Sequence, residues 1–139
     1  MPLVNTAKKK FADGDIDFVS DTIKVMLLTN SHTTDIDTQE FIDDVSANEV
    51  AGTGYTTGGE TLGTKSNTVD TANDQTEVDA ADVTWSSSTI TARYAVVYKD
   101  TGTPGTSAII QIIDFGADKT STGGDFTIQW DTEGLFKLV

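Results

Sequence analysis

Four aspartates near the start of the chain have the oxygen chemistry that calcium binds, and their spacing resembles that of a calcium loop. In the stretch FADGDIDFVSDTIKVMLL they are Asp13, Asp15, Asp17 and Asp21. Counted from the first, they occupy the first, third, fifth and ninth places of an EF-hand loop, which also needs glycine at the sixth place and glutamate at the twelfth. Those two places hold Phe18 and Lys24, so the sequence excludes an EF-hand. A looser calcium site at Asp13, Asp15 and Asp17 stays open; the alternative is that these residues end a helix and flank a turn.

The other polar residues predict no catalytic machinery. The single histidine, His32, lies in the polar segment TNSHTTD, and with no second histidine or cysteine we expect it on the solvated surface. The acidic pairs Asp43–Asp44, Asp79/Asp82 and Asp131/Glu133 could serve a glycosidase, but among 22 acidic residues such pairs arise by abundance. The segment GTGYTTGGETLG lacks the GK[ST] ending of a phosphate loop and indicates glycine-rich turns instead. We therefore predict a protein that is not an enzyme and has no cofactor.

Composition and charge restrict the partners of the chain. It has 139 residues, no cysteine and a net charge of −13. Such a charge repels nucleic-acid phosphates, so we expect no nucleic-acid partner. There is no apolar run of membrane-spanning length and no apolar leader at the N-terminus, so we expect neither a membrane protein nor an exported one.

One basic cluster stands out in this acidic chain. Lys8, Lys9 and Lys10, followed by Phe11, lie in a predicted N-terminal helix capped by Asn5 and ended by a glycine turn. These four residues form our candidate contact with another subunit, through an acidic surface of that partner. The alternative is a solvated helix face.

The remaining patterns predict a mainly β protein. A second short helix is expected within residues 37–49, and a buried strand over IKVMLLT. From about residue 50, short strands and turn residues alternate: DAADVTW, TITARYAVVYKD, SAIIQIIDF, DFTIQWD and GLFKLV are the strand candidates. The polar stretch SNTVDTANDQTEVDA is either a mobile loop or a pair of edge strands. Trp85, Trp130, Tyr94 and Tyr98 are expected in the core because they lie in these strands.

Together these elements predict a single domain, residues 1–139, with an antiparallel, jelly-roll-like β-sandwich. Residues 1–14 would form a short N-terminal helix or arm. One or two short helices fall in the N-terminal third.

Several dispersed segments resemble a family of small virion structural proteins of tailed bacteriophages and prophages. They are AxxxFxDGxIDFxxDTIKVMLL, FIDDVSANEVAGTGYTTGGETL, DVTWSSSTITARYAVVYKDTGT and IIDFGADKTSTGGDFTIQWDTEG. The resemblance implies a capsid cement (decoration) protein, a dimer or trimer that binds the major capsid protein outside an HK97-type shell and stabilises it. Such a protein is made in the bacterial cytoplasm and ends in the virion. A tail- or fibre-associated module that contacts a protein or glycan is the alternative.

Overall fold

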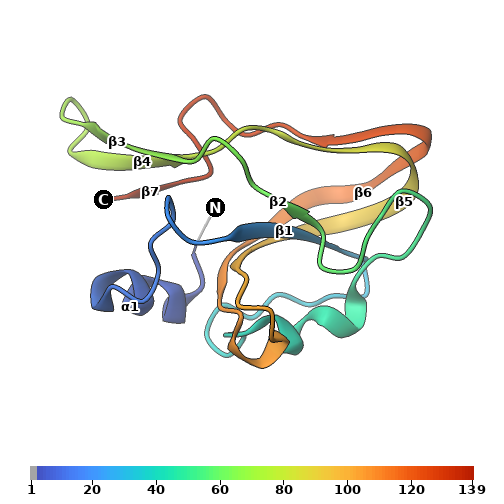
Figure 1. The fold of residues 1–139 in the computed structure, drawn as a ribbon, viewed down its shortest axis with the longest axis horizontal. Coiled ribbons are helices and arrows are strands. Elements are labelled where there is room, and N and C mark those ends of the chain that lie inside the picture. Colours follow the sequence, from blue (N-terminus) through green and yellow to red (C-terminus); the bar gives the residue numbers. More distant parts are fainter. Residues whose placement is uncertain (1–2) are drawn as a thin grey trace.

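Two antiparallel sheets form the framework of the protein. A computed structural model describes residues 3–139. The larger sheet has the order β2-β1-β5-β6 and is built from Glu60–Thr61, Ile23–Leu28, Val83–Lys99 and Ile109–Ile128, respectively. The smaller has the order β3-β4-β7, from Ser66–Asp70, Gln75–Asp79 and Phe136–Leu138. The predicted mainly β, antiparallel sandwich with a short helix near the N-terminus is confirmed (Figure 1).

The two layers of the sandwich come largely from one bent hairpin. β5 and β6 have 17 and 20 residues, and they run out as one layer, curl at the right of Figure 1 and return as another. Register shifts between Trp85 and Ser88 and between Ala92 and Tyr94 mark irregularities along the pair. Extra residues at such bulges bend a strand and leave its pairing intact on either side. DAADVTW and TITARYAVVYKD, which we expected as two strands, therefore share one.

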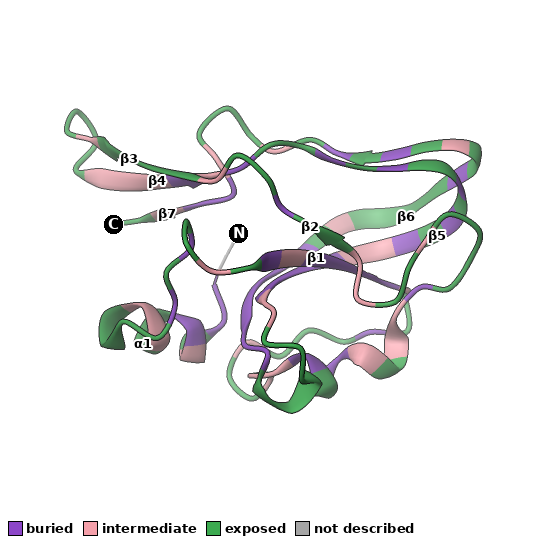
Figure 2. Cartoon of the chain, viewed as in Figure 1, coloured by how far each residue is buried: buried purple, intermediate pink, exposed green. Residues whose placement is uncertain are grey.

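The main core lies between these layers. Trp85 and Ile90 of β5 are buried together with Val25, Leu27 and Val97 from the opposite layer. A smaller core, which includes Met26 of β1 and Val96 of β5, covers the outer face of the same strands. Both strands carry buried segments, purple in Figure 2. The central position expected for TITARYAVVYKD is confirmed, because its second half is buried on both faces.

The N-terminal helix forms largely as expected. α1 (Asn5–Asp13) ends at Gly14, whose φ of 81° is left-handed and whose amide donates to the carbonyl oxygens of Lys10 and Phe11. Asn5 is the first helical residue and not the cap; the cap is Val4.

The prediction of a second helix within residues 37–49 is wrong. The chain instead makes two 3₁₀ turns, Ile42–Asp44 and Ser46–Asn48. The Asp44 carboxylate accepts the amides of Glu40 and Phe41, at 2.9 and 3.1 Å, and so caps the first turn. This local bonding competes with a continuous helix.

The polar stretch left open between a loop and edge strands forms strands. β3 and β4 pair from Ser66↔Asp79 to Asp70↔Gln75, and their hairpin projects at the left of Figure 1. Asp70 accepts hydrogen bonds from the turn residues Ala72 and Asn73. No helix within residues 3–139 has the length and apolarity needed to cross a membrane.

Candidate functional site

The bent hairpin leaves one side of the sandwich open. We call residues 109–115 of β6, before its bend, the first arm, and residues 119–128, after the bend, the second arm. Beside the open side lies a hollow of about 630 Å³, between the first arm and the segment that leads from β6 into β7. Its lining comes from two runs of the chain, residues 113–115 and 128–137. The bend in the hairpin brings these runs together although they are distant in sequence.

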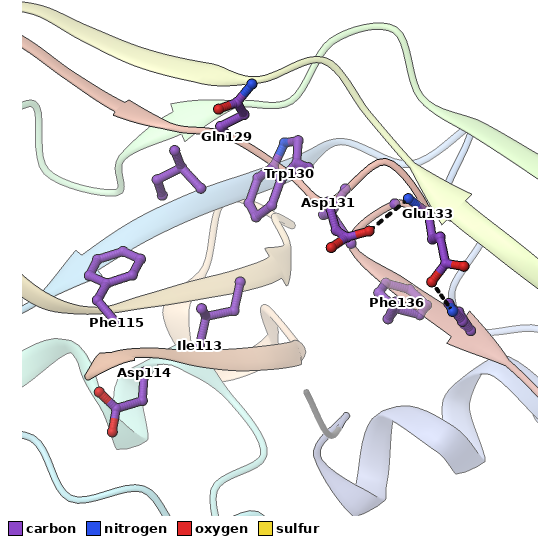
Figure 3. A pocket seen from close by; sticks show the side chains of 12 residues that line it. Ile113, Asp114, Phe115, Gln129, Trp130, Asp131, Glu133 and Phe136 are labelled. Carbon is purple, nitrogen blue, oxygen red and sulfur yellow. Dashed lines mark hydrogen bonds and ion pairs between the residues drawn. The ribbon is translucent and has the colours of Figure 1, made fainter.

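Apolar side chains form the inside of this hollow. Figure 3 shows Ile113 and Phe115 rising from the first arm toward the ring of Trp130, whereas Asp114 points the opposite way. Ile113 is buried, and Phe115 and Trp130 are half-buried. The Trp130 indole donates from Nε1 to the Ala81 carbonyl oxygen at 2.9 Å, which fixes the ring at the mouth of the hollow.

A second hollow of about 360 Å³ continues the first along β6. The two share Phe115, Ile128 and Gln129 in their linings. Phe126 forms part of the second, with its ring centroid 6.3 Å from that of Phe115. We call the two hollows together the β6 groove.

The groove follows an uncovered strand edge. β6 is the last strand of its sheet, paired with β5 on one side. On the other side only its beginning is covered: Val4 donates to the Ile110 carbonyl oxygen, and Ile109 donates to that of Glu40. Among residues 3–139, the stretch 112–128 pairs with no strand except β5. Its outward backbone groups are therefore available to another strand.

Charged side chains surround the groove. Arg93 makes two hydrogen bonds to the Asp114 carboxylate, at 2.6 and 3.3 Å, and this contact lowers the pKa of Asp114. Glu133 pairs with Lys137. Asp125, Asp131 and Lys119 make no ion pair with any described residue, so two unpaired acids stand against one unpaired base and the rim keeps a net negative charge.

The predicted contact residues on α1 divide into two kinds. Lys10 pairs with Glu40 and lies 5.1 Å from the centre of the Phe41 ring, so it is bound within the domain. Phe11 packs on Phe136, 5.8 Å between ring centroids.

The other two lysines reach solvent. Lys9 is exposed and pairs with Asp13 one turn along the helix, and Lys8 is exposed beside Asn5. Lys8 and Lys9 are therefore the members of the predicted cluster that another molecule can reach, and the docking role of the cluster stays a prediction.

The opening aspartates serve helix and turn. Asp13 pairs with Lys9, and Asp17 accepts the Ser20 amide at 3.1 Å while its own amide donates to Asp21. Within residues 3–139, no group of three or more acidic or histidine side chains is placed to hold a metal ion. The expected turn at Asp17 and Asp21 is confirmed.

His32 corrects an expectation. The residue is 3% exposed, and its ring meets that of Tyr94 edge-on with centroids 4.9 Å apart. Thr34 is its hydrogen-bond partner, 3.2 Å from Nε2. The prediction of a solvated histidine is therefore wrong: the ring of Tyr94 covers it, and burial lowers its pKa.

The glycine-rich segment GTGYTTGGETLG forms turns that take part in a half-buried hydrogen-bond network with Glu49 and Tyr98. Glu49 accepts the Tyr55 hydroxyl at 2.8 Å and the Gly58 amide at 2.6 Å. The Tyr98 hydroxyl donates to the Gly58 carbonyl oxygen at 2.6 Å. Burial raises the pKa of both tyrosines, so the two hydroxyls stay protonated and structural.

The sequence did not point to the groove. Of the four aromatic residues expected in the core, Trp85 and Tyr98 are fully buried, whereas Trp130 and Tyr94 are half-buried. Trp130 follows the alternation of DFTIQWD, and nothing in that pattern shows that its strand ends at an open side. Neither a protein-family model, nor a curated protein, nor a solved structure matches the chain.

Proposed function

We propose that this protein is a non-enzymatic virion structural protein, a capsid cement protein that binds the outside of an icosahedral phage shell and stabilises it. The observation that carries the proposal is the β6 groove beside an uncovered strand edge. Half-buried aromatic rings next to free backbone groups are features of a surface that contacts another protein.

The charge supports a place on the outer surface. Packaged DNA repels a domain of net charge −13 from the interior of a capsid, and it has no such effect outside. A cement protein meets many identical subunits, so weak individual contacts add up through multivalency. The major capsid protein is the proposed partner, with the cement protein as a dimer or trimer.

Binding to shells tests the proposal. Expanded, DNA-free shells of the cognate major capsid protein are mixed with the purified protein and sedimented over a range of salt concentrations. We expect saturable binding and a higher temperature at which the particles burst. If the protein stays in the supernatant at every salt concentration, the proposal is wrong.

Two variants then locate the contact. The double variant Lys8→Glu/Lys9→Glu changes the accessible part of the α1 cluster, and Asp125→Lys changes the groove rim. Glu60→Lys is the matched control for the second, because Glu60 is an exposed acid on β2, the opposite edge of the same sheet. Loss of shell binding in one variant and not in the control identifies the face that meets the shell.

A tail- or fibre-associated module is the second candidate. The half-buried rings of Phe115 and Trp130 in the groove, with the polar side chains of Gln129 and Asp131 nearby, are the kind of surface on which a sugar ring stacks. Saturable glycan binding that Trp130→Ala abolishes, together with labelling of the tail in virions, would favour this candidate.

A further inference from the structure

The β6 groove and the free edge of β6 occupy the same place, and this coincidence restricts what can bind there. A free strand edge offers backbone N–H and C=O groups at a regular spacing, which another strand satisfies in full. The groove offers apolar contact along that edge. A ligand that uses both features has an extended backbone and side chains that point into the groove.

The side chains of β6 repeat with the period of a strand. Phe126 and Ile128 lie two positions apart on the second arm, Trp130 continues this alternation just past the end of β6, and Ile113 and Phe115 lie two positions apart on the first arm. All five line the groove. An added strand would therefore place every second side chain against these rings and aliphatic groups, and the side chains between them would point outward.

The negative charge around the groove favours positively charged side chains on the outward face of an added strand. Asp125 and Asp131 are rim acids without ion-pair partners among the described residues, and the whole domain carries −13. On the part of β6 that carries the free edge, Asp118 and Asp125 outnumber Lys119, so the edges of two copies would bring together surfaces of like net charge. A second copy is thus disfavoured, and lysine or arginine on the added strand is favoured.

We infer that the β6 groove binds an extended segment of another protein, with alternating apolar and basic residues, as an added strand of the larger sheet. The inference rests on the proposed function, in which that other protein is the shell subunit. The shell subunit must then present an extended segment of alternating apolar and basic residues. A sugar satisfies few of the periodic backbone groups, so a glycan fits this edge less well than a strand does.

A synthetic peptide tests the strand without the shell. The probe is acetylated and amidated Lys-Val-Lys-Val-Lys-Thr-Lys. Its control is the same peptide with N-methyl groups on its fourth and fifth residues, which keeps the charge but removes two successive N–H groups, one of which must face β6 in an added strand. Titration calorimetry measures the affinity, and hydrogen exchange measures protection of amides. We expect saturable binding of the probe, at least tenfold weaker binding of the control, and new amide protection confined to one arm of the β6 edge, either residues 112–115 or residues 125–128.

Variants tie the binding to the groove. Trp130→Ala and Phe115→Ala should each weaken probe binding by about tenfold, the effect of removing an aromatic anchor. Asp125→Lys should weaken it by about threefold at physiological salt, while Glu60→Lys, at the opposite edge, should leave it unchanged. Should Trp130→Ala fail to fold, Phe115→Ala and Asp125→Lys carry the test.

Three results would overturn the inference. Equal binding of the probe and its N-methylated control would mean attraction by charge alone. Protection of 112–129 that rises with protein concentration in the absence of peptide would mean that a second copy occupies the edge. Glycan binding in the groove together with no probe binding would assign the site to a sugar.

The two proposals fail separately. Shell binding without probe binding leaves the cement function standing and refutes the strand. Probe binding without shell binding supports the strand-accepting groove and refutes the cement function.

Discussion

Replacing Gly59 with alanine should destabilise the domain severely, because β2 passes too close to β1 for any side chain there. A Cβ at Gly59 would lie 1.7 Å from the Val25 carbonyl oxygen and 2.6 Å from its carbon. Both are backbone atoms of a buried strand, so no side-chain rotation relieves the clash. The φ of +80° adds strain of about 1 kcal/mol for a residue with a Cβ.

The magnitude follows from what β2 loses when it moves away from β1. Its pairing is short, Lys24↔Thr61 and Val25↔Glu60, and is extended by the Leu62 amide, which donates to the Ile23 carbonyl oxygen at 2.8 Å. Leu62 is 3% exposed, and its exposure costs about 2 kcal/mol. With about 1 kcal/mol for the lost hydrogen bond, Gly59→Ala should lower the free energy of unfolding by about 4 kcal/mol.

Urea and thermal unfolding, followed by circular dichroism, measure the change. A loss of this size lowers the melting temperature by about 14 °C in a domain of this length. Gly63→Ala is the control: a Cβ there meets nothing within 4 Å, and its φ lies outside the left-handed region. We expect that variant within about 1 kcal/mol of the parent. If Gly59→Ala unfolds together with the control, the close approach of β2 to β1 is wrong.

Two buried polar groups give further predictions. Burial lowers the pKa of His32 in the folded state below its ordinary value of 6.5. As the pH drops from about 7.5, the unfolded chain therefore binds a proton before the folded chain does, and the free energy of unfolding falls. The loss stops growing once the pH is below the pKa of the folded state. His32→Phe, which keeps an aromatic contact with Tyr94, should flatten the slope of unfolding free energy between pH 7.5 and 5.5; an unchanged slope would contradict the burial. The buried hydroxyls of Ser88 and Ser121 lie 2.7 Å apart, so Ser88→Ala and Ser121→Ala should each cost about 1–2 kcal/mol in urea unfolding and the double variant less than their sum. Strict additivity would mean that the two do not interact.

Local patterns in the sequence predict the elements whose causes are local. Gly14 ends α1 because only a residue without Cβ takes the left-handed conformation at no cost, and that requirement is visible in the sequence. The alternation of DFTIQWD indicates a strand with one buried face, and Phe126 and Ile128 are buried as expected. The mainly β class follows from many such short patterns.

Several features depend on contacts between distant segments, and the sequence does not reveal them. His32 is buried because Tyr94, 62 positions along the chain, covers its ring, whereas the residues around it resemble a solvated loop. Residues 37–49 have helical spacing, but the Asp44 carboxylate and the β-bridge of Phe41 to Ala108 impose turns instead.

In the candidate site, too, some features follow from the sequence alone and others depend on contacts between distant segments. Composition and spacing alone establish the charge of −13, the lack of cysteine, the strand pattern of β6 and the basic cluster of α1. Which lysines are accessible depends on Glu40 and on the packing of the helix against β7, both distant in sequence. The β6 groove exists because a hairpin of 17 and 20 residues bends over itself and leaves one edge unpaired. Strand alternation reports which side of a strand is buried, but a free edge depends on which strands pair, and only the tertiary structure decides that.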